Sequence, residues 1–271
     1  MMQLIRFLNE SKLLVAFAAA ALCAETFFLC DSKISSIIIA QAFFLTWSAY
    51  LFLKSYVGVG KRVMIYTAAT GSVLSILYNP SVPWWLIAGV GLLVLMYSSH
   101  NAQRYGLKLG VSLRGVPIVK TLAIATCWTV IATFSVAFFD TDIDEGTIYL
   151  IAASNFLFIA ALSLAEDIRD TYRDHHRIET IVALFGVGWA KSFAIFLLVL
   201  SSVICCFTPT FETPEIALAY LSVMAIAIII ILLLSPKRSR QIQALAIDGI
   251  IILRFLAIAY VSIVVLEKTL K

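Results

Sequence analysis

The stretch that decides the fold runs from Thr147 to Ala165, TIYLIAASNFLFIAALSLA, and passes directly into the charged sequence EDIRDTYRD at 166–174. The first part is apolar and close to the roughly 20 residues that a helix needs to cross a bilayer. If the helix continues, Asp167, Asp170 and Asp174 are spaced i, i+3 and i+7 and share one face. An Asp at the centre of a span costs about 2.5–3.5 kcal/mol, so this acidic stripe is expected to face water, a metal ion or a polar cavity.

The composition is that of a membrane protein. Of the 271 residues, 62% are hydrophobic and 13% are charged, against about 25% charged residues in soluble domains, and the mean hydropathy is +0.99. The five cysteines lack the spacing of a disulfide framework or a zinc site, which predicts packing residues. The net charge of +4 is concentrated in particular loops, so it does not indicate a nucleic-acid partner.

Nine apolar segments follow one another along the chain, most of them close to the length of a transmembrane helix. The third and fourth are short and are divided only by the sequence NPSVP at 79–83. The sequence therefore predicts an all-α, polytopic membrane protein of about nine transmembrane helices. The predicted spans are 13–30, 34–53, 63–79, 83–97, 118–139, 147–165, 188–207, 215–234 and 244–266.

Basic residues are concentrated in alternate loops, which predicts the orientation in the membrane. By the positive-inside rule these loops, the amino terminus and the acidic stripe face the cytoplasm, and the carboxyl terminus lies outside. Lys268 and Lys271 do not follow this pattern, and the other loops carry only Lys33. The basic loops follow the second, fourth, sixth and eighth segments and contain Lys54, Lys61, Arg62, Arg104, Lys108, Arg114, Arg169, Arg173, Arg177, Lys237, Arg238 and Arg240.

Several polar residues fall inside the predicted spans, where an idle polar group is rare. Asn155 lies about three helical turns before Glu166, which places it on the face of the acidic stripe. Glu25 is expected to be a hydrogen-bond partner between helices. Asp248 is expected either to reach the polar cavity or to pair with another helix, and its spacing from Arg254 places these two on different faces.

The pattern Asp167-x-x-Asp170-x-x-x-Asp174, followed by RIET at 177–180 and LFG at 184–186, resembles the second aspartate-rich motif of the UbiA superfamily of intramembrane prenyltransferases. Arg177 stands where the family usually has Gly. The similarity extends to LRGVPIVK at 113–120 and on through Trp128. Nine spans with an inside amino terminus also match, so the resemblance implies a UbiA-like helical bundle in which 1–271 form a single transmembrane prenyltransferase-like domain.

The first aspartate-rich motif of that family, N-D-x-x-D-x-x-x-D at the cytoplasmic end of the second span, has no counterpart here. The corresponding sequence is YLFLKSYVGVGKR at 50–62. Leu53, Lys54, Val57 and Lys61 stand where the Asn and the acids would be. One side of the family's metal site is therefore missing.

The resemblance implies a chemistry in which an allylic diphosphate ionises and the carbocation alkylates an acceptor, with Mg²⁺ neutralising the leaving group. It assigns Asp170 and Asp174 as catalytic residues and as Mg²⁺ ligands, with Asp167 as a further ligand and Glu166 in support. We expect a lysine, Lys54 above all, to replace the missing motif as a point charge for phosphate. The alternatives are that the acids pair with neighbouring arginines on a solvated helix end and that the basic residues are ordinary positive-inside residues. The expected diphosphate-binding residues are Lys54, Arg62, Arg114, Lys120 and Lys191.

The predicted function is Mg²⁺-dependent transfer of an isoprenyl group from an isoprenyl diphosphate to a lipophilic acceptor in the bilayer. A terpene cyclase of the UbiA type is an alternative in the same class of enzyme. A non-catalytic relative that binds an isoprenoid or a partner protein is the alternative favoured by the missing first motif. Transport is a further alternative, but the sequence shows no internal repeat or paired broken helices to support it.

Overall fold

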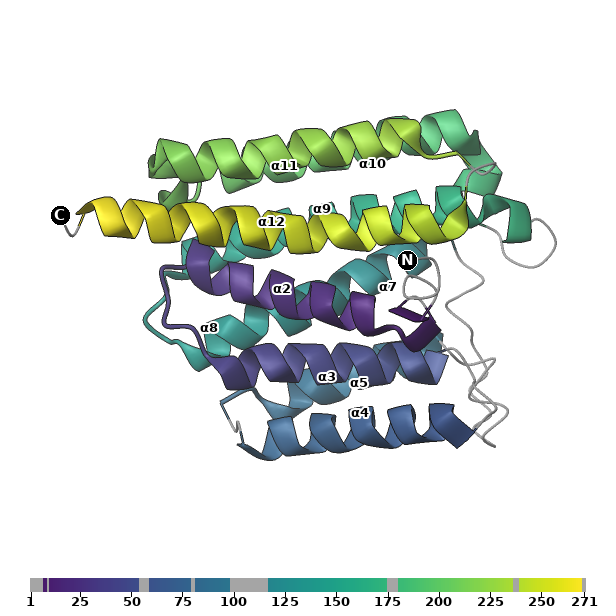
Figure 1. The fold of residues 1–271 in the computed structure, drawn as a ribbon, viewed down its shortest axis with the longest axis horizontal. Coiled ribbons are helices and arrows are strands. Elements are labelled where there is room, and N and C mark those ends of the chain that lie inside the picture. The colour runs from purple at the N-terminus through teal and green to yellow at the C-terminus, as the bar shows by residue number, and fades with distance from the viewer. Residues whose placement is uncertain are drawn as a thin grey trace.

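A computed structural model shows the chain as a bundle of long helices (Figure 1). The structure describes residues 7–8, 10–53, 59–78, 81–97, 117–174, 180–235 and 239–269. Within these ranges the secondary structure is entirely helical, which confirms the predicted all-α class. The helices are α2 (Leu13–Leu29), α3 (Ser36–Leu53), α4 (Val59–Tyr78), α5 (Trp84–Tyr97), α7 (Pro117–Thr129), the π-helical turn η3 (Val130–Phe134), α8 (Ser135–Phe139), α9 (Glu145–Asp174), α10 (Ile181–Cys205), the 3-10 turn η4 (Pro209–Glu212), α11 (Pro214–Leu233) and α12 (Arg240–Thr269).

The long helices lie side by side and run alternately in opposite directions (Figure 1). α2 and α12 begin at the end of the bundle where α9 finishes, on the right of Figure 1, and α12 ends at the opposite side. We refer to the end where α9 finishes as the charged end, because the acidic stripe lies there. The opposite placement of the start of α2 and the finish of α12 is the one expected for an odd number of spans.

The predicted spans correspond to the observed helices, with differences at their ends. The segments 63–79 and 83–97 are two separate helices, and Pro83 precedes α5, where its carbonyl accepts from Leu86 N at 3.0 Å. α9 extends past 165 to Asp174, as the spacing of the acids predicts. α10 begins earlier than predicted, at Ile181, and is broken at Gly186, whose φ of 84° an L side chain rarely adopts.

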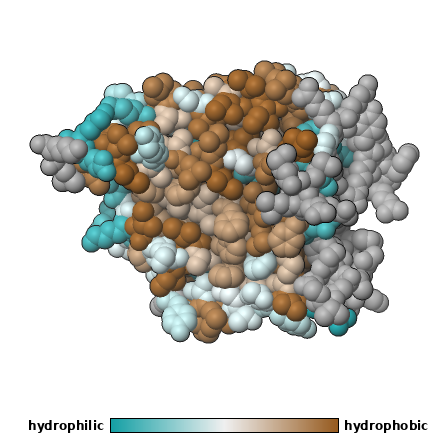
Figure 2. Space-filling model, viewed as in Figure 1, coloured by the Kyte–Doolittle hydropathy of each residue, from teal (hydrophilic) through white to brown (hydrophobic). Residues whose placement is uncertain are grey.

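The surface of the bundle is that of a protein surrounded by lipid. Six helical stretches among the described residues are long and apolar enough to cross a membrane, and α2 and α5 are shorter apolar helices. Large apolar side chains such as Leu218 and Tyr260 are about 70% exposed, at 69% and 70%. Figure 2 shows hydrophobic residues covering the middle of one face, with hydrophilic residues gathered toward its ends. An apolar surface of this extent is unfavourable in water, so the chain is an integral membrane protein.

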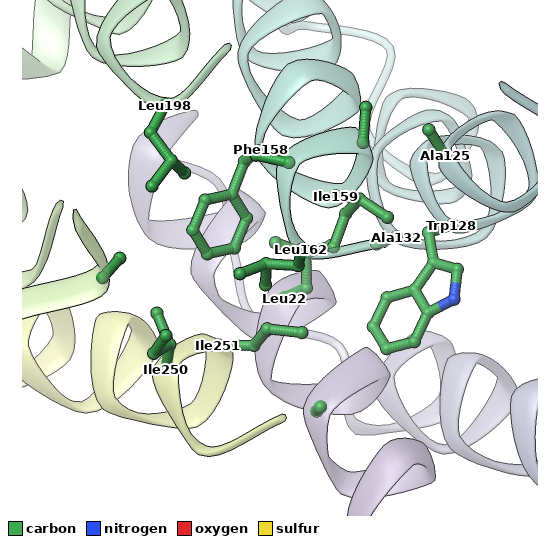
Figure 3. Packing of buried hydrophobic residues seen from close by; sticks show 14 of the residues in the cluster. Leu22, Ala125, Trp128, Ala132, Phe158, Ile159, Leu162, Leu198, Ile250 and Ile251 are labelled. Atoms are coloured by element: carbon green, nitrogen blue, oxygen red, sulfur yellow. The ribbon is translucent and has the colours of Figure 1, made fainter. Parts of the chain in front are cut away.

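α9 is the central helix of the bundle. In its membrane-spanning part 72% of the residues are buried, against 28–44% in the other candidate spans. Phe158, Ile159 and Leu162 of α9 meet Leu22 of α2 and residues of α7, α10 and α12 in one continuous core (Figure 3). The direction of the last turns of α9 is therefore fixed by packing on all sides.

A buried ionic network ties four elements together halfway along the bundle. Arg254 of α12 is fully buried and donates from Nε to Glu25 Oε2 at 2.9 Å and from Nη2 to Asn155 Oδ1 at 2.7 Å. Asn155 Nδ2 in turn donates to Thr133 Oγ1 at 3.0 Å. The guanidinium lies 3.9 Å from the centre of the Phe158 ring. Glu25 is thus an interhelical partner as expected, and Asn155, about three turns before Glu166 on α9, is a second partner of Arg254.

Candidate functional site

A chamber of about 240 Å³ opens at the charged end between α3, α5, α7, α9 and the residue that precedes α2. Its charged lining comes from the last turns of α9, the first turn of α7 and the start of α2. The rest of the wall is mostly apolar and lies deeper along the helices. The polar residues that line it are Lys12, Thr46, Tyr50, Lys120, Glu166, Arg169 and Asp170.

The α9 wall is held together by Arg169. Its Nε donates to Asp170 Oδ1 at 2.9 Å and its Nη2 to Asp170 Oδ2 at 3.1 Å, so both carboxylate oxygens are engaged. Nη2 also donates to Glu166 Oε1 at 3.3 Å, one helical turn earlier. The Arg169 side chain is 8% exposed and that of Asp170 is 20% exposed. The residues alternate in sign along one helix, but they line a cavity and do not project from a solvated helix end.

The α7 wall carries an ion pair between Lys120 and Asp167. Pro117 begins α7, where a missing N–H costs nothing, and this start places Lys120 within the first turn. The Asp167 side chain is fully buried, at 0% exposed, and that of Lys120 is 17% exposed. Asp167 therefore faces α7 behind the chamber wall, while Lys120 bridges it to the chamber.

The third cationic group is Lys12, at the start of α2. Lys12 adopts φ 61°, which is uncommon for a residue other than glycine. The turn is held by Trp47, whose Nε1 donates to the Ser11 carbonyl at 2.8 Å. Lys12 Nζ lies 5.9 Å from the centre of the Tyr50 ring, within cation–π range. The start of α2 therefore contributes a positive charge to the chamber.

An apolar groove continues from the chamber along α3, α5, η3 and the start of α8. It has a volume of about 300 Å³ and shares Ala49, Val90, Val94 and Ile131 with the chamber wall. Apart from Ser48 and Ser135, its lining is hydrophobic or glycine. Together the two cavities form an elongated site with a charged head and an apolar tail.

The residues predicted for the site are only partly brought together. Asp170 and Lys120 line the chamber, and Asp167 contacts Lys120. Arg62 is exposed on α4 and is not part of the chamber wall. Lys191 of α10 instead donates to the Leu232 carbonyl near the end of α11 at 2.7 Å, where a cation is favourable.

Three predicted residues lie wholly or partly outside the described residues. Lys54 and Arg114 are outside the ranges that the structure describes. Asp174 is the last residue of α9, but its side chain is not among those described. The replacement of the first motif by Lys54 therefore stays a prediction.

The fit of a Mg²⁺ ion can be judged from the donor set. Across the described ranges, no group of three or more His, Cys, Asp or Glu is arranged to hold a metal ion. Mg²⁺ is often bound by only one or two carboxylates when substrate phosphates supply further oxygens. Asp170 meets that smaller requirement, with Asp174 one turn further along the backbone of α9. The residues therefore fit a metal that arrives together with a diphosphate.

Sequence reasoning missed Lys12, Tyr50 and Trp128 as parts of the chamber. Trp128 Nε1 donates to the Tyr50 hydroxyl at 3.4 Å across α7 and α3. Their positions in the sequence could have indicated this, because Lys12 lies just before α2 and Tyr50 near the end of α3, and both of these helix ends lie at the charged end. The neighbouring Arg169 was considered only as a partner for the acids.

The fold is similar to that of a known membrane protein. A solved structure, described in a study of the biosynthesis of digeranylgeranylglyceryl phosphate synthase in membranes, matches with a TM-score of 0.57 and 12% sequence identity. The match covers 97% of this chain and 99% of the other. No protein-family model matches the sequence, and no curated protein matches it. The shared property is thus the fold of an integral membrane helical bundle, over nearly the whole length of both chains.

Proposed function

We propose that the chain is a UbiA-like membrane prenyltransferase that moves an isoprenyl group from an isoprenyl diphosphate to a lipophilic acceptor. The observation that carries this proposal is the joining of a charged chamber to an apolar groove. An isoprenyl diphosphate has the same division, with a charged head and a long apolar tail. The similarity in fold to the structure of digeranylgeranylglyceryl phosphate synthase supports the same class of reaction.

In this proposal the diphosphate lies in the chamber, against Lys120 and Lys12. A lysine ammonium suits phosphate as a compact point charge. The isoprenyl tail extends into the groove through the shared residues Val90 and Ile131. The allylic carbon is then at the junction, where the apolar walls exclude water from the carbocation.

The acids of α9 serve the leaving group. Asp170, and Asp174 after it, would hold Mg²⁺, which when bound neutralises the charge that develops on the departing diphosphate. Arg169 holds the Asp170 carboxylate in place through two hydrogen bonds, at 2.9 and 3.1 Å. Asp167 orients Lys120 from behind. We also propose that the charged end faces the cytoplasm, because α3, α9 and α11 finish there (Figure 1) and basic stretches follow them in the sequence.

The test is binding of geranylgeranyl S-thiolodiphosphate, an analogue that does not ionise, to the full chain in nanodiscs with Mg²⁺. Asp170→Asn and Lys120→Met are each expected to weaken binding about tenfold or more, because each removes a charged partner of the head group. Asp142→Asn and Lys33→Met are the matched controls at the opposite end of the bundle. Thermal unfolding of each variant, with Lys120→Arg as the variant that keeps the charge, separates a binding loss from misfolding.

The outcomes separate the candidate functions. Binding together with diphosphate release from geranylgeranyl diphosphate supports the transferase. Tight binding without turnover would identify an isoprenoid-binding protein. Equal binding by the wild type, Asp170→Asn and Lys120→Met would show that the chamber does not hold the diphosphate.

A further inference from the structure

A second, smaller cavity lies directly beside the chamber, between α3, α7, α9 and α12. Its volume is about 20 Å³, and it shares Tyr50, Ile124, Trp128 and Glu166 with the chamber wall. Figure 3 shows four residues of its lining, Trp128, Ile159, Leu162 and Ile251, within the core. A cavity that holds a water molecule needs roughly 10–15 Å³, so this one has the size of a single oxygen-bearing group.

Two polar side chains that line this cavity have no hydrogen-bond partner among the residues that the structure describes. Ser163 of α9 is 3% exposed, and its Oγ makes no hydrogen bond. Asp248 of α12 is 8% exposed, and in the described part of the chain no hydrogen bond or ion pair reaches its carboxylate. Buried polar groups are hydrogen-bonded in the great majority of cases. Ser163 Oγ is such a group, and the Asp248 carboxylate lines the same small cavity, so we infer a ligand oxygen there that bonds to both.

We propose that this cavity is the nucleophile subsite, which takes the hydroxyl group of a long-chain alcohol or phenol as the acceptor. This inference rests on the proposed function, because the subsite adjoins the chamber in which the diphosphate would ionise. The hydroxyl donates to the Asp248 carboxylate and accepts from the Ser163 hydroxyl. The charged groups that act on Asp248 are Glu166 and Arg169 of α9 and Lys12 before α2.

The transfer step balances with these groups. The bond between the allylic carbon and the diphosphate oxygen breaks, and the electron pair leaves with the diphosphate. A lone pair of the acceptor oxygen forms the new carbon–oxygen bond. The hydroxyl proton passes to the Asp248 carboxylate, and from there to water by way of the chamber. The product is a prenyl ether.

Binding can be tested without any diphosphate by photolabelling the full chain in nanodiscs. The probe is hexadecanol with a diazirine near the hydroxyl, and the matched probe is its methyl ether, which has no hydrogen to donate. We expect the alcohol to label peptides containing 159–163 and 247–251 about tenfold more than the ether does. Asp248→Ala is expected to reduce this labelling about tenfold, and Ser163→Ala to reduce it as well. Ser222→Ala, which changes a serine on the exposed face of α11, is expected to leave it unchanged.

A second measurement tests the proton transfer. Asp248→Asn keeps the size and a hydrogen-bond acceptor but cannot take the proton. We expect it to keep the labelling while transfer of the prenyl group to hexadecanol falls about a hundredfold or more. Equal labelling by both probes, or full labelling of Asp248→Ala, would overturn the subsite. Unchanged transfer by Asp248→Asn would overturn its role as the base.

Alcohol binding in the small cavity and diphosphate binding in the chamber can be tested separately. Asp170→Asn lies outside the small cavity, so it is expected to label normally with the alcohol while losing the diphosphate analogue. Labelling without any diphosphate binding would therefore refute the transferase and leave the hydroxyl subsite standing. Diphosphate binding without labelling would refute the hydroxyl subsite and leave the transferase standing.

Discussion

The substitution Glu25→Gln tests whether the buried network of Arg254 holds the bundle together. Arg254 is fully buried, and Glu25 is the carboxylate that its Nε contacts at 2.9 Å. A glutamine keeps the size of the side chain and an oxygen to accept the bond, but it removes the compensating charge. The guanidinium cannot escape by losing its proton. The variant therefore leaves a charged group buried against neutral partners.

The size of the effect follows from that geometry. Breaking one partner of a buried ion pair costs about 3–5 kcal/mol. The bond to Asn155 at 2.7 Å and the contact with the Phe158 ring remain, so we expect the lower end, about 3 kcal/mol. In a chain of this length, each kcal/mol corresponds to roughly 2–4 °C in melting temperature. Glu25→Gln is therefore expected to melt about 6–12 °C below the wild type.

The assay is thermal unfolding in detergent of the wild type, Glu25→Gln, Arg254→Met and the double variant. Because the double variant removes both charges, we expect it to be no less stable than Glu25→Gln. The two substitutions should then show a coupling energy of about 2–3 kcal/mol. Additive losses, within about 0.5 kcal/mol, would refute the reasoning, since they would show that the two groups do not depend on each other.

Three further predictions concern the groove, the outermost helix and the start of α9. Val90→Phe fills the junction of chamber and groove, so it should weaken binding of the geranylgeranyl analogue more than that of the geranyl analogue, as measured by competition. A side chain at Gly71 would meet the Phe44 ring, so Gly71→Ala should lower the stability by about 1–3 kcal/mol in thermal scans. Asp144 accepts from Thr147 N at 2.8 Å as the cap of α9, so Asp144→Ala should cost about 0.5–2 kcal/mol and leave analogue binding unchanged.

The fold was predictable because length and hydropathy specify spans without reference to packing. The extension of α9 to Asp174 was predictable from the charge spacing, and Asp170 and Lys120 were correctly placed at one end of the bundle. The rotation of each helix was less accessible, because spans that are apolar on every side carry little information about which face is buried. Contacts between helices distant in the sequence were equally inaccessible, as Asn155 shows. It shares a face with the acids but lies about 16 Å deeper along α9, where Arg254 arrives from a distant part of the sequence.

The same limit applies to Lys12 and Asp248. Both belong to helices whose contact with α9 depends on how α2 and α12 cross it, and no local pattern encodes that contact. Lys12 resembles an ordinary basic residue before a first span, yet its left-handed conformation places it in the chamber wall. Asp248 was expected either to pair or to reach the cavity, and it lines the small cavity beside the chamber.

Removal of Mg²⁺ distinguishes two ways of holding a diphosphate. Among the charged side chains that the structure describes around the chamber, three are acids and three are cations. A diphosphate adds several negative charges to this balanced set, and the described cations are already partly neutralised by their neighbours. The six residues are Glu166, Asp167, Asp170, Lys12, Lys120 and Arg169.

We therefore expect chelation of Mg²⁺ to weaken binding of the thiolodiphosphate analogue about tenfold or more, since a divalent cation supplies charge that the lysines lack. Asp170→Asn should bind the analogue equally weakly with and without Mg²⁺, because the carboxylate that would hold the metal ion is gone. If the wild type binds equally well after chelation, the cations alone hold the head group. In that case the lysines have taken over the role of the missing first motif, and Asp170 serves to orient Arg169.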